Sequence, residues 1–150
     1  HIYSKFYRDS HKEEQIKYFE KALELEPNNR IVINNLAYVY GKFNEVQKAD
    51  EFYQKALDLE PDSINALAFS ALNKTHLKQI DIAKEQVLKV LEKCENSAFL
   101  LYVAGRIHHL AGDYEEAKRY LIKAYELEQF KVILMCFRRK EEGKHANQSR

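Results

Sequence analysis

Six histidines and two cysteines are the side chains of this sequence best suited to metal or nucleophilic chemistry. None of the histidines belongs to an HExxH motif, which would place two imidazoles and a carboxylate around one metal. His108 and His109 are adjacent and point in different directions on a helix, so we expect a packed His108 and a surface His109. Cys94 and Cys136 form no CxxC pair and no disulfide framework, and we expect both to be buried or inert thiols in a reducing compartment. The sequence therefore predicts no metal site.

The sequence supports neither phosphate binding nor acid catalysis. The four glycines form neither a GxGxxG nor a Walker pattern, which would bring backbone amides around a phosphate. Paired carboxylates such as Glu115 and Glu116 fall on exposed helical turns, where nothing would raise a pKa for acid catalysis. We predict no catalytic residue and no cofactor, and we do not expect an enzyme.

Composition and charge exclude several other classes of protein. With 45% hydrophobic and 31% charged residues, the chain is too apolar to be disordered and too interrupted by charge to span a membrane. A net charge of +1 gives no overall field for nucleic acid or an anionic membrane. Only the segment from Lys131 to the end is basic, with six Lys or Arg and two Glu. No signal stretch opens the chain, so the expected location is cytoplasmic.

An internal repeat supplies the elements that carry these residues. The segment Ala22-Leu-Glu-Leu-Glu-Pro27 returns as Ala56-Leu-Asp-Leu-Glu-Pro61, and the two prolines are 34 residues apart. If three repeats start at residues 30, 64 and 98, small residues recur in them at two positions where helices must approach closely. The eighth position holds Ala37, Ala71 and Gly105, and the twentieth holds Ala49, Ala83 and Ala117. This period and these residues resemble the tetratricopeptide repeat family.

The resemblance implies an all-α, right-handed α-solenoid of about four helix-turn-helix repeats. Residues 1–131 would form the array, with a partial first repeat (1–29) and three full repeats (30–63, 64–97 and 98–131). Capping-box spacing at Ser10 and Glu13, and at Asp113 and Glu116, predicts the start of a second helix at each place. Gly112 and Asn44 are suited to the turns between helices, and Pro27 and Pro61 to the ends of second helices.

Three of the repeats depart from the family pattern. The first has Tyr3 and Gln15 at the positions for small residues. The third has Lys74 in place of a usual tyrosine, Val90 in place of an alanine and Glu95 in place of the terminal proline. The fourth has His108 at the tyrosine position and Gln129 at the proline position.

Residues 132–150 are expected to form a capping helix over the last hairpin, followed by a basic tail. The alternative is a patch for self-association, in which Leu134→Ser and Phe137→Ser would turn a dimer into a monomer.

The resemblance also implies where a partner would bind. In the family, first helices of successive repeats line a concave groove, and a protein scaffold binds a peptide segment or helix of its partner there. On this chain the corresponding residues are Tyr7, Asn34, Asn35, Tyr38, Asn65, Phe69, Leu72, His76, Phe99, Tyr102, Arg106 and His109. Aromatic rings are frequent anchors of protein interfaces, and asparagine can both donate to and accept from a peptide backbone. The alternative for each ring is packing between helices.

The sequence gives less support to two further classes of partner, a chaperone tail and RNA. Co-chaperone members of the family clamp a C-terminal carboxylate with lysine, arginine and asparagine, but the matching positions here hold Asn34, Tyr38, Phe69, Phe99 and Val103. We therefore expect no binding of a chaperone tail that ends in EEVD. RNA binding through the basic cluster Arg138-Arg139-Lys140 is a weaker alternative, because Glu141 and Glu142 interrupt the cluster.

Overall fold

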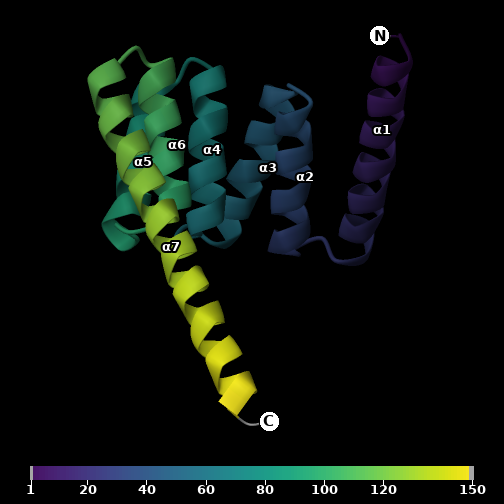
Figure 1. Cartoon of the computed structure of the whole chain (residues 1–150). Coiled ribbons are helices and arrows are strands. Elements are labelled where there is room, and N and C mark those ends of the chain that lie inside the picture. The colour runs from purple at the N-terminus through teal and green to yellow at the C-terminus, as the bar shows by residue number, and fades with distance from the viewer. Residues whose placement is uncertain (1, 149–150) are drawn as a thin grey trace. The chain divides into compact units, whose positions relative to one another are not determined.

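The computed structural model describes the backbone of residues 2–148 and the side chains of residues 11–144, except those of residues 130, 133, 137 and 141. Every regular element in that range is a helix, as the sequence predicts (Figure 1): α1 (Ile2–Leu25), α2 (Arg30–Lys42), α3 (Val46–Leu59), α4 (Ile64–His76), α5 (Ile80–Lys93), α6 (Ala98–Leu110) and α7 (Tyr114–Gln148). None of these described helices combines the length and the apolar composition needed to cross a membrane.

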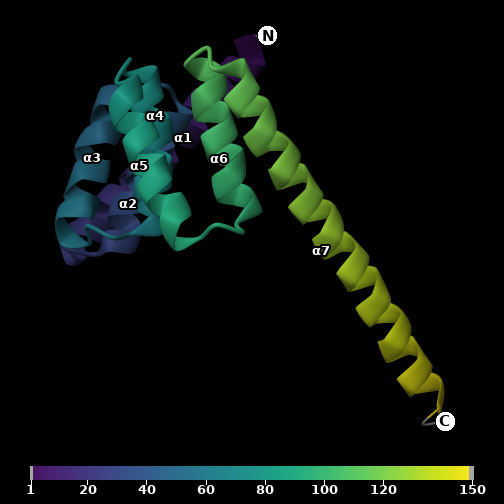
Figure 2. The ribbon, with the colours of Figure 1, turned by 90° about the vertical axis from the view of Figure 1, so that its left-hand side faces the viewer.

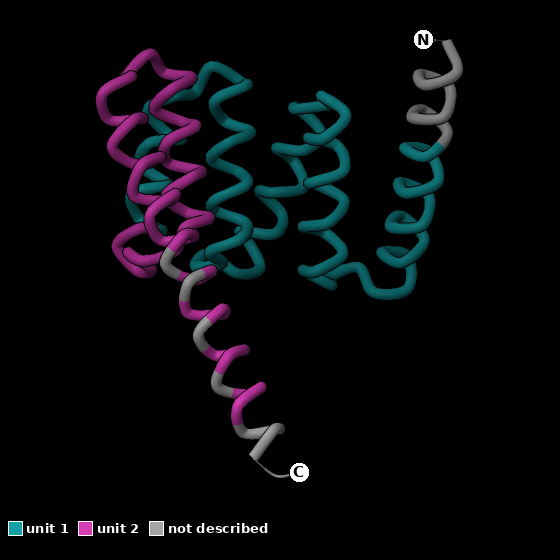
Figure 3. The backbone as a smooth tube through the Cα atoms, viewed as in Figure 1, with its two compact units in different colours: residues 1–90 teal, residues 91–150 magenta. Residues whose placement is uncertain are grey.

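The chain divides into two compact units (Figure 3). Residues 1–90 form the first unit, which holds α1 to α4 and most of α5. Residues 91–150 form the second unit, which holds the end of α5 together with α6 and α7.

The turns inside the hairpins repeat with the 34-residue period. Asn44, Lys78 and Gly112 have positive φ angles of 64°, 65° and 85°. Each is the second residue after the end of a hairpin's first helix. In each turn the next amide donates to a carbonyl five residues earlier, as in the bond of 2.9 Å from Glu45 N to Tyr40 O. This pattern satisfies carbonyls that the helix end leaves unpaired. Asn44 and Gly112 confirm the predicted turn residues, whereas Lys78 adopts a conformation that costs an L-residue with a Cβ about 1–2 kcal/mol.

The first helix of each complete hairpin starts with a capping side chain at the same repeat position. Asn29 Oδ1 accepts from Ile31 N at 3.1 Å and from Val32 N at 3.2 Å. Ser63 Oγ accepts from Ala66 N at 3.4 Å, and Ser97 Oγ accepts from Leu100 N at 3.3 Å. These bonds pair amides that would otherwise have no partner in the first turn, which explains where α2, α4 and α6 begin.

The expected turn at Ser10 is wrong. α1 runs without a break from Ile2 to Leu25, so the described chain contains α1 and three hairpins, not a folded first repeat. Ser10 stands at the repeat position of Asn44, Lys78 and Gly112. The capping-box spacing of Ser10 and Glu13 therefore does not by itself break the helix at this position.

The core forms where small residues let helices approach. Ala37, Ala49, Ala71 and Ala83 are fully buried, as the repeat pattern predicts. In the second unit, a Cβ added at Gly105 would lie 2.6 Å from Leu121 Cγ, so α6 and α7 meet too closely there for any larger residue to fit without a shift. These positions bring the two helices of each hairpin into contact.

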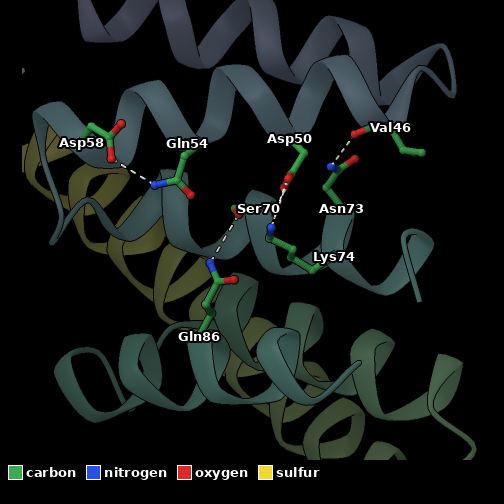
Figure 4. A network of polar contacts seen from close by, with 8 residues as sticks. All are labelled: Val46, Asp50, Gln54, Asp58, Ser70, Asn73, Lys74 and Gln86. Carbon is green, nitrogen blue, oxygen red and sulfur yellow. Dashed lines mark hydrogen bonds and ion pairs between the residues drawn. The ribbon is translucent and has the colours of Figure 1, made fainter. Parts of the chain in front are cut away.

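Polar side chains join α3, α4 and α5 within the first unit (Figure 4). Asn73 Nδ2 donates to Val46 O at 2.9 Å, and Gln86 Nε2 donates to Ser70 Oγ at 3.3 Å. Lys74 Nζ lies 2.9 Å from Asp50 Oδ1. Lys74 occupies the position that is usually tyrosine in the family, and its pairing with Asp50 gives the physical reason for that departure.

The predicted capping helix is not a separate element. Residues 132–148 are helical, but they continue α7, which runs beyond the end of α6 as one helix (Figures 1 and 2). Two signals that mark the boundary between earlier repeats are absent here: a proline after the second helix and a capping residue before the next helix. Gln129 stands at the position of Pro27 and Pro61, and Lys131 stands at the position of the capping residues Asn29, Ser63 and Ser97. Glutamine and lysine are both good helix formers, so the backbone continues.

Candidate peptide-binding surface

A pocket of about 310 Å³ lies between α2 and α4 in the first unit. Five of the residues predicted for the groove line it, together with Ile31 and Tyr53: Asn34, Asn35, Tyr38, Asn65 and Phe69. Asn35, Tyr38 and Asn65 are exposed, whereas Asn34 and Phe69 are half-buried. The repeat spacing thus brings these residues to one place, although they come from two helices about 30 residues apart in sequence.

Aromatic rings give this pocket its apolar character. The Tyr38 and Phe69 rings meet edge to face, with centroids 5.4 Å apart and planes at 71°. Tyr53 of α3 is buried beside them, and burial, with a smaller contribution from Tyr38, raises the pKa of its hydroxyl above the usual value. The Tyr53 hydroxyl therefore stays protonated at neutral pH.

Asn34 carries an unsatisfied acceptor in the pocket wall. Its Oδ1 atom is buried and has no hydrogen-bond partner among the described residues. A buried polar atom left in this state costs about 1–3 kcal/mol. A rotation of the amide toward the pocket would allow Oδ1 to accept a hydrogen bond from a ligand N–H.

A second hollow, of about 360 Å³, adjoins the same face of α2. Gln15, Tyr18 and Phe19 of α1 line one side of it, and Asn35 and Tyr38 line the other. Gln15, Tyr18 and Phe19 were not predicted as groove residues, because the repeat frame places them on a second helix and the groove on first helices. α1 does not fold back at Ser10, so Tyr18 remains exposed. Tyr7, the residue predicted for this end of the groove, lies outside the described side chains.

The remaining predicted residues lie on exposed helix faces. Leu72 is half-buried and His76 exposed on α4. In the second unit, Phe99, Tyr102, Arg106 and His109 are all exposed on α6, at intervals of three and four residues that place them on one face. Tyr38, Phe99 and Tyr102 are 49%, 42% and 47% exposed, so part of each ring is accessible to a partner, although Tyr38 also packs on Phe69.

The structure also shows the surroundings of the adjacent histidines and of the two cysteines. His108 is largely buried and stacks on Tyr120 with ring centroids 5.4 Å apart, whereas His109 is exposed, as expected for both. Cys94 is half-buried, but Cys136 is exposed, contrary to prediction, because residues 132–148 do not fold over the hairpin. Among the residues with described side chains, no group of three His, Cys, Asp or Glu is arranged to hold a metal ion.

Fold and surface together define an α-helical repeat protein with aromatic rings and asparagines along its first helices. The family model for the tetratricopeptide repeat matches residues 10–29, 32–63 and 100–130, which is more than half of the chain. The chain belongs to the tetratricopeptide repeat family. Residues 64–97, where the signature departs most, lie outside the matched ranges, yet they form the α4–α5 hairpin.

Solved structures of MamA share this fold. A MamA structure from Desulfovibrio magneticus RS-1 (residues 41 to the end) is 20% identical, with a TM-score of 0.68 over 85% of this chain and 72% of that one. The structure titled MamA MSR-1 C2 is 18% identical, with a TM-score of 0.64 over 84% and 72% of the two chains. No curated protein sequence matches the chain. The all-α solenoid class is therefore confirmed.

Proposed function

We propose that this chain, whose family has a general role as a scaffold for protein interaction, binds an extended peptide segment or helix of a partner protein along α2 and α4. The observation that carries the proposal is the pocket lined by Asn34, Asn35, Tyr38, Asn65 and Phe69. The rings supply apolar anchoring surface and the asparagines supply uncharged donors and acceptors, a combination suited to a peptide backbone.

The pocket favours a peptide over a nucleic acid. Its lining contains no lysine or arginine, and the neighbouring hollow adds Lys42 together with Glu14. Phosphate groups are bound mainly by positive side chains, so neither hollow provides the charge that RNA binding needs.

Selection of peptides from a displayed library on the purified chain tests the proposal. We expect selected peptides to bind wild type and to lose about five- to 150-fold in affinity on Tyr38→Ala or Phe69→Ala, which corresponds to about 1–3 kcal/mol for an interface anchor. Leu88→Ala, an equally exposed apolar residue on α5, is the control and should leave affinity unchanged.

The second unit carries exposed rings of its own. Phe99 and Tyr102 are exposed on α6, so Phe99→Ala or Tyr102→Ala should weaken binding of selected peptides that contact this face, while the helical circular dichroism signal stays unchanged. Peptides that bind all four alanine variants as tightly as wild type would place the binding site elsewhere. Failure to select any peptide would contradict the proposal itself.

A further inference from the structure

α7 carries an apolar stripe on a face other than the one that packs on α6. Ala117 and Ala124 are the buried residues that mark the side facing α6. Ile122, Tyr125 and Val132 lie on another face and are 47%, 66% and 51% exposed, and Cys136 on the same face is also exposed. We define the α7 stripe as Ile122, Tyr125, Gln129, Val132 and Cys136.

The spacing within the α7 stripe alternates between three and four residues. This spacing keeps side chains on one face of a helix and is the pattern of a seam between two paired helices. Nothing in the described part of the second unit covers that face. A long helix segment without tertiary contacts is only marginally stable in water, so packing the stripe against another helix would stabilise the second half of α7.

Charges beside the stripe indicate what that other helix is. Glu126 flanks the first half of the stripe, whereas Arg139 and Lys140 flank its end, and all three side chains are exposed. In two parallel copies of α7, Glu126 would meet Glu126. In two antiparallel copies, Glu126 of each chain would lie within about one helical turn of the partner's basic end.

We propose that two copies of this chain pair through their α7 stripes in antiparallel orientation. The two-fold axis passes between Gln129 and Val132, so that Gln129 faces Val132 across the seam and Tyr125 faces Cys136. Every contact then occurs twice, as an isologous interface requires. This pairing is independent of the peptide pocket, which lies on α2 and α4 in the other unit.

Molar mass in solution tests whether pairing occurs. We expect wild type to be a dimer at tens of micromolar by light scattering, and Tyr125→Ser/Val132→Ser to be a monomer. Leu134→Ser is the matched control, because Leu134 is as exposed as Val132 but lies on the opposite side of α7, and this variant should remain a dimer. A monomeric wild type, or dissociation by Leu134→Ser but not by the stripe variant, would overturn the proposal.

A charge exchange tests the orientation. Glu126→Lys and Lys140→Glu should each weaken the dimer, because each places like charges at both ends of the seam. The double variant Glu126→Lys/Lys140→Glu should restore the dimer. Additive weakening in the double variant would contradict antiparallel pairing.

Oxidative cross-linking provides a second readout of orientation in a Cys94→Ser background. Antiparallel pairing separates the two Cys136 residues by about 16 Å along the helices, beyond the reach of a disulfide. Cys136 alone should then give no cross-linked dimer, whereas Tyr125→Cys should cross-link to Cys136 of the partner subunit. Efficient cross-linking through Cys136 alone would show that the helices run parallel.

Discussion

At the residue scale, the close approach of α6 and α7 in the second unit leaves no room for a side chain at Gly105. A Cβ there would meet Leu121 at 2.6 Å, whereas a Cβ at Gly41 would meet its nearest neighbours, Ala49 and Asn73, at an ordinary 3.8 Å. Both glycines lie inside helices, so replacing either with alanine gains helix propensity, and only Gly105 adds a steric conflict. The same substitution should therefore have opposite effects at the two sites.

We predict that Gly105→Ala lowers the free energy of unfolding by about 1 kcal/mol, because overpacking typically costs more than the propensity gain. Gly41→Ala should raise it by about 0.5–1 kcal/mol. Urea denaturation of the two variants checks both signs. A stabilising Gly105→Ala would mean that Leu121 moves aside at no cost.

The buried tyrosine hydroxyls should make stability depend on alkaline pH. Burial raises the pKa of Tyr53 and of Tyr40 above the ordinary 10.0, and Glu20 and Glu45 add to the effect at Tyr40. The folded chain holds these protons more tightly than the unfolded chain, so their contribution is fully present below pH 10 and is lost as pH rises above it.

We predict that Tyr53→Phe loses less stability than wild type above pH 10, as measured by denaturation at a series of pH values. Tyr125→Phe, which changes an exposed hydroxyl, should follow the wild-type curve. If Tyr53→Phe and wild type lose stability in parallel, Tyr53 ionises normally in the folded chain.

At the element scale, the helices that could be predicted are those whose ends carry local signals. Asn29, Ser63 and Ser97 cap helix starts, and Asn44 and Gly112 close turns, so α2, α3, α4 and α6 begin and end close to where the repeat frame places them. The break predicted at Ser10 and the end predicted for α7 are wrong. At Ser10 a capping pattern lies inside one continuous helix, and at Gln129 and Lys131 the family frame suggested an end although the proline and the capping residue of the earlier repeats were missing.

The candidate site could be predicted only where the repeat position of a residue decides its exposure. The repeat frame identified which first-helix residues reach the surface, because exposure follows helical position. It could not identify Tyr53 as a pocket residue, because that residue belongs to a second helix and is a signature core position. Nor could it identify the hollow at Tyr18, which depends on the path of α1.

One of the polar contacts between α3 and α4 is an ion pair with restricted solvent access. The side chains of Lys74 and Asp50 are 15% and 26% exposed, whereas those of Arg30 and Glu60, 2.8 Å apart, are 58% and 41% exposed. A double-mutant cycle on Lys74→Met and Asp50→Asn should give a coupling energy of about 1–2 kcal/mol. The cycle on Arg30→Met and Glu60→Gln should give less than about 0.5 kcal/mol, because solvent and salt screen that pair. Equal coupling energies would mean that burial does not strengthen the Lys74–Asp50 pair.

At the scale of the whole molecule, membership in the tetratricopeptide repeat family does not determine the partner. Recognition of a chaperone tail needs positive charges at several first-helix positions, and those positions hold Asn34, Tyr38, Phe69 and Phe99 on the accessible face. The remaining position holds Val103, which is fully buried and cannot contact a ligand. These positions therefore lack the positive charges that a clamp for a terminal carboxylate needs.

We predict no measurable binding of a peptide ending in EEVD. Fluorescence anisotropy with a labelled peptide, and with its C-terminal amide as the uncharged control, checks this expectation. Micromolar binding that is lost on amidation would show a carboxylate clamp formed by other residues.

The Lys74–Asp50 pair also limits how freely these repeats could be rearranged. The common backbone period suggests interchangeable modules that a protein engineer could reorder or duplicate. However, the residues one period before the pair are Ile16 and Tyr40, so these two repeat boundaries of the first unit carry different chemistry. A duplicate of residues 64–97 placed after itself would put Lys84 opposite a second Lys74. Two like charges would replace the ion pair, so the order of the repeats is encoded at their junctions as well as in the linear sequence.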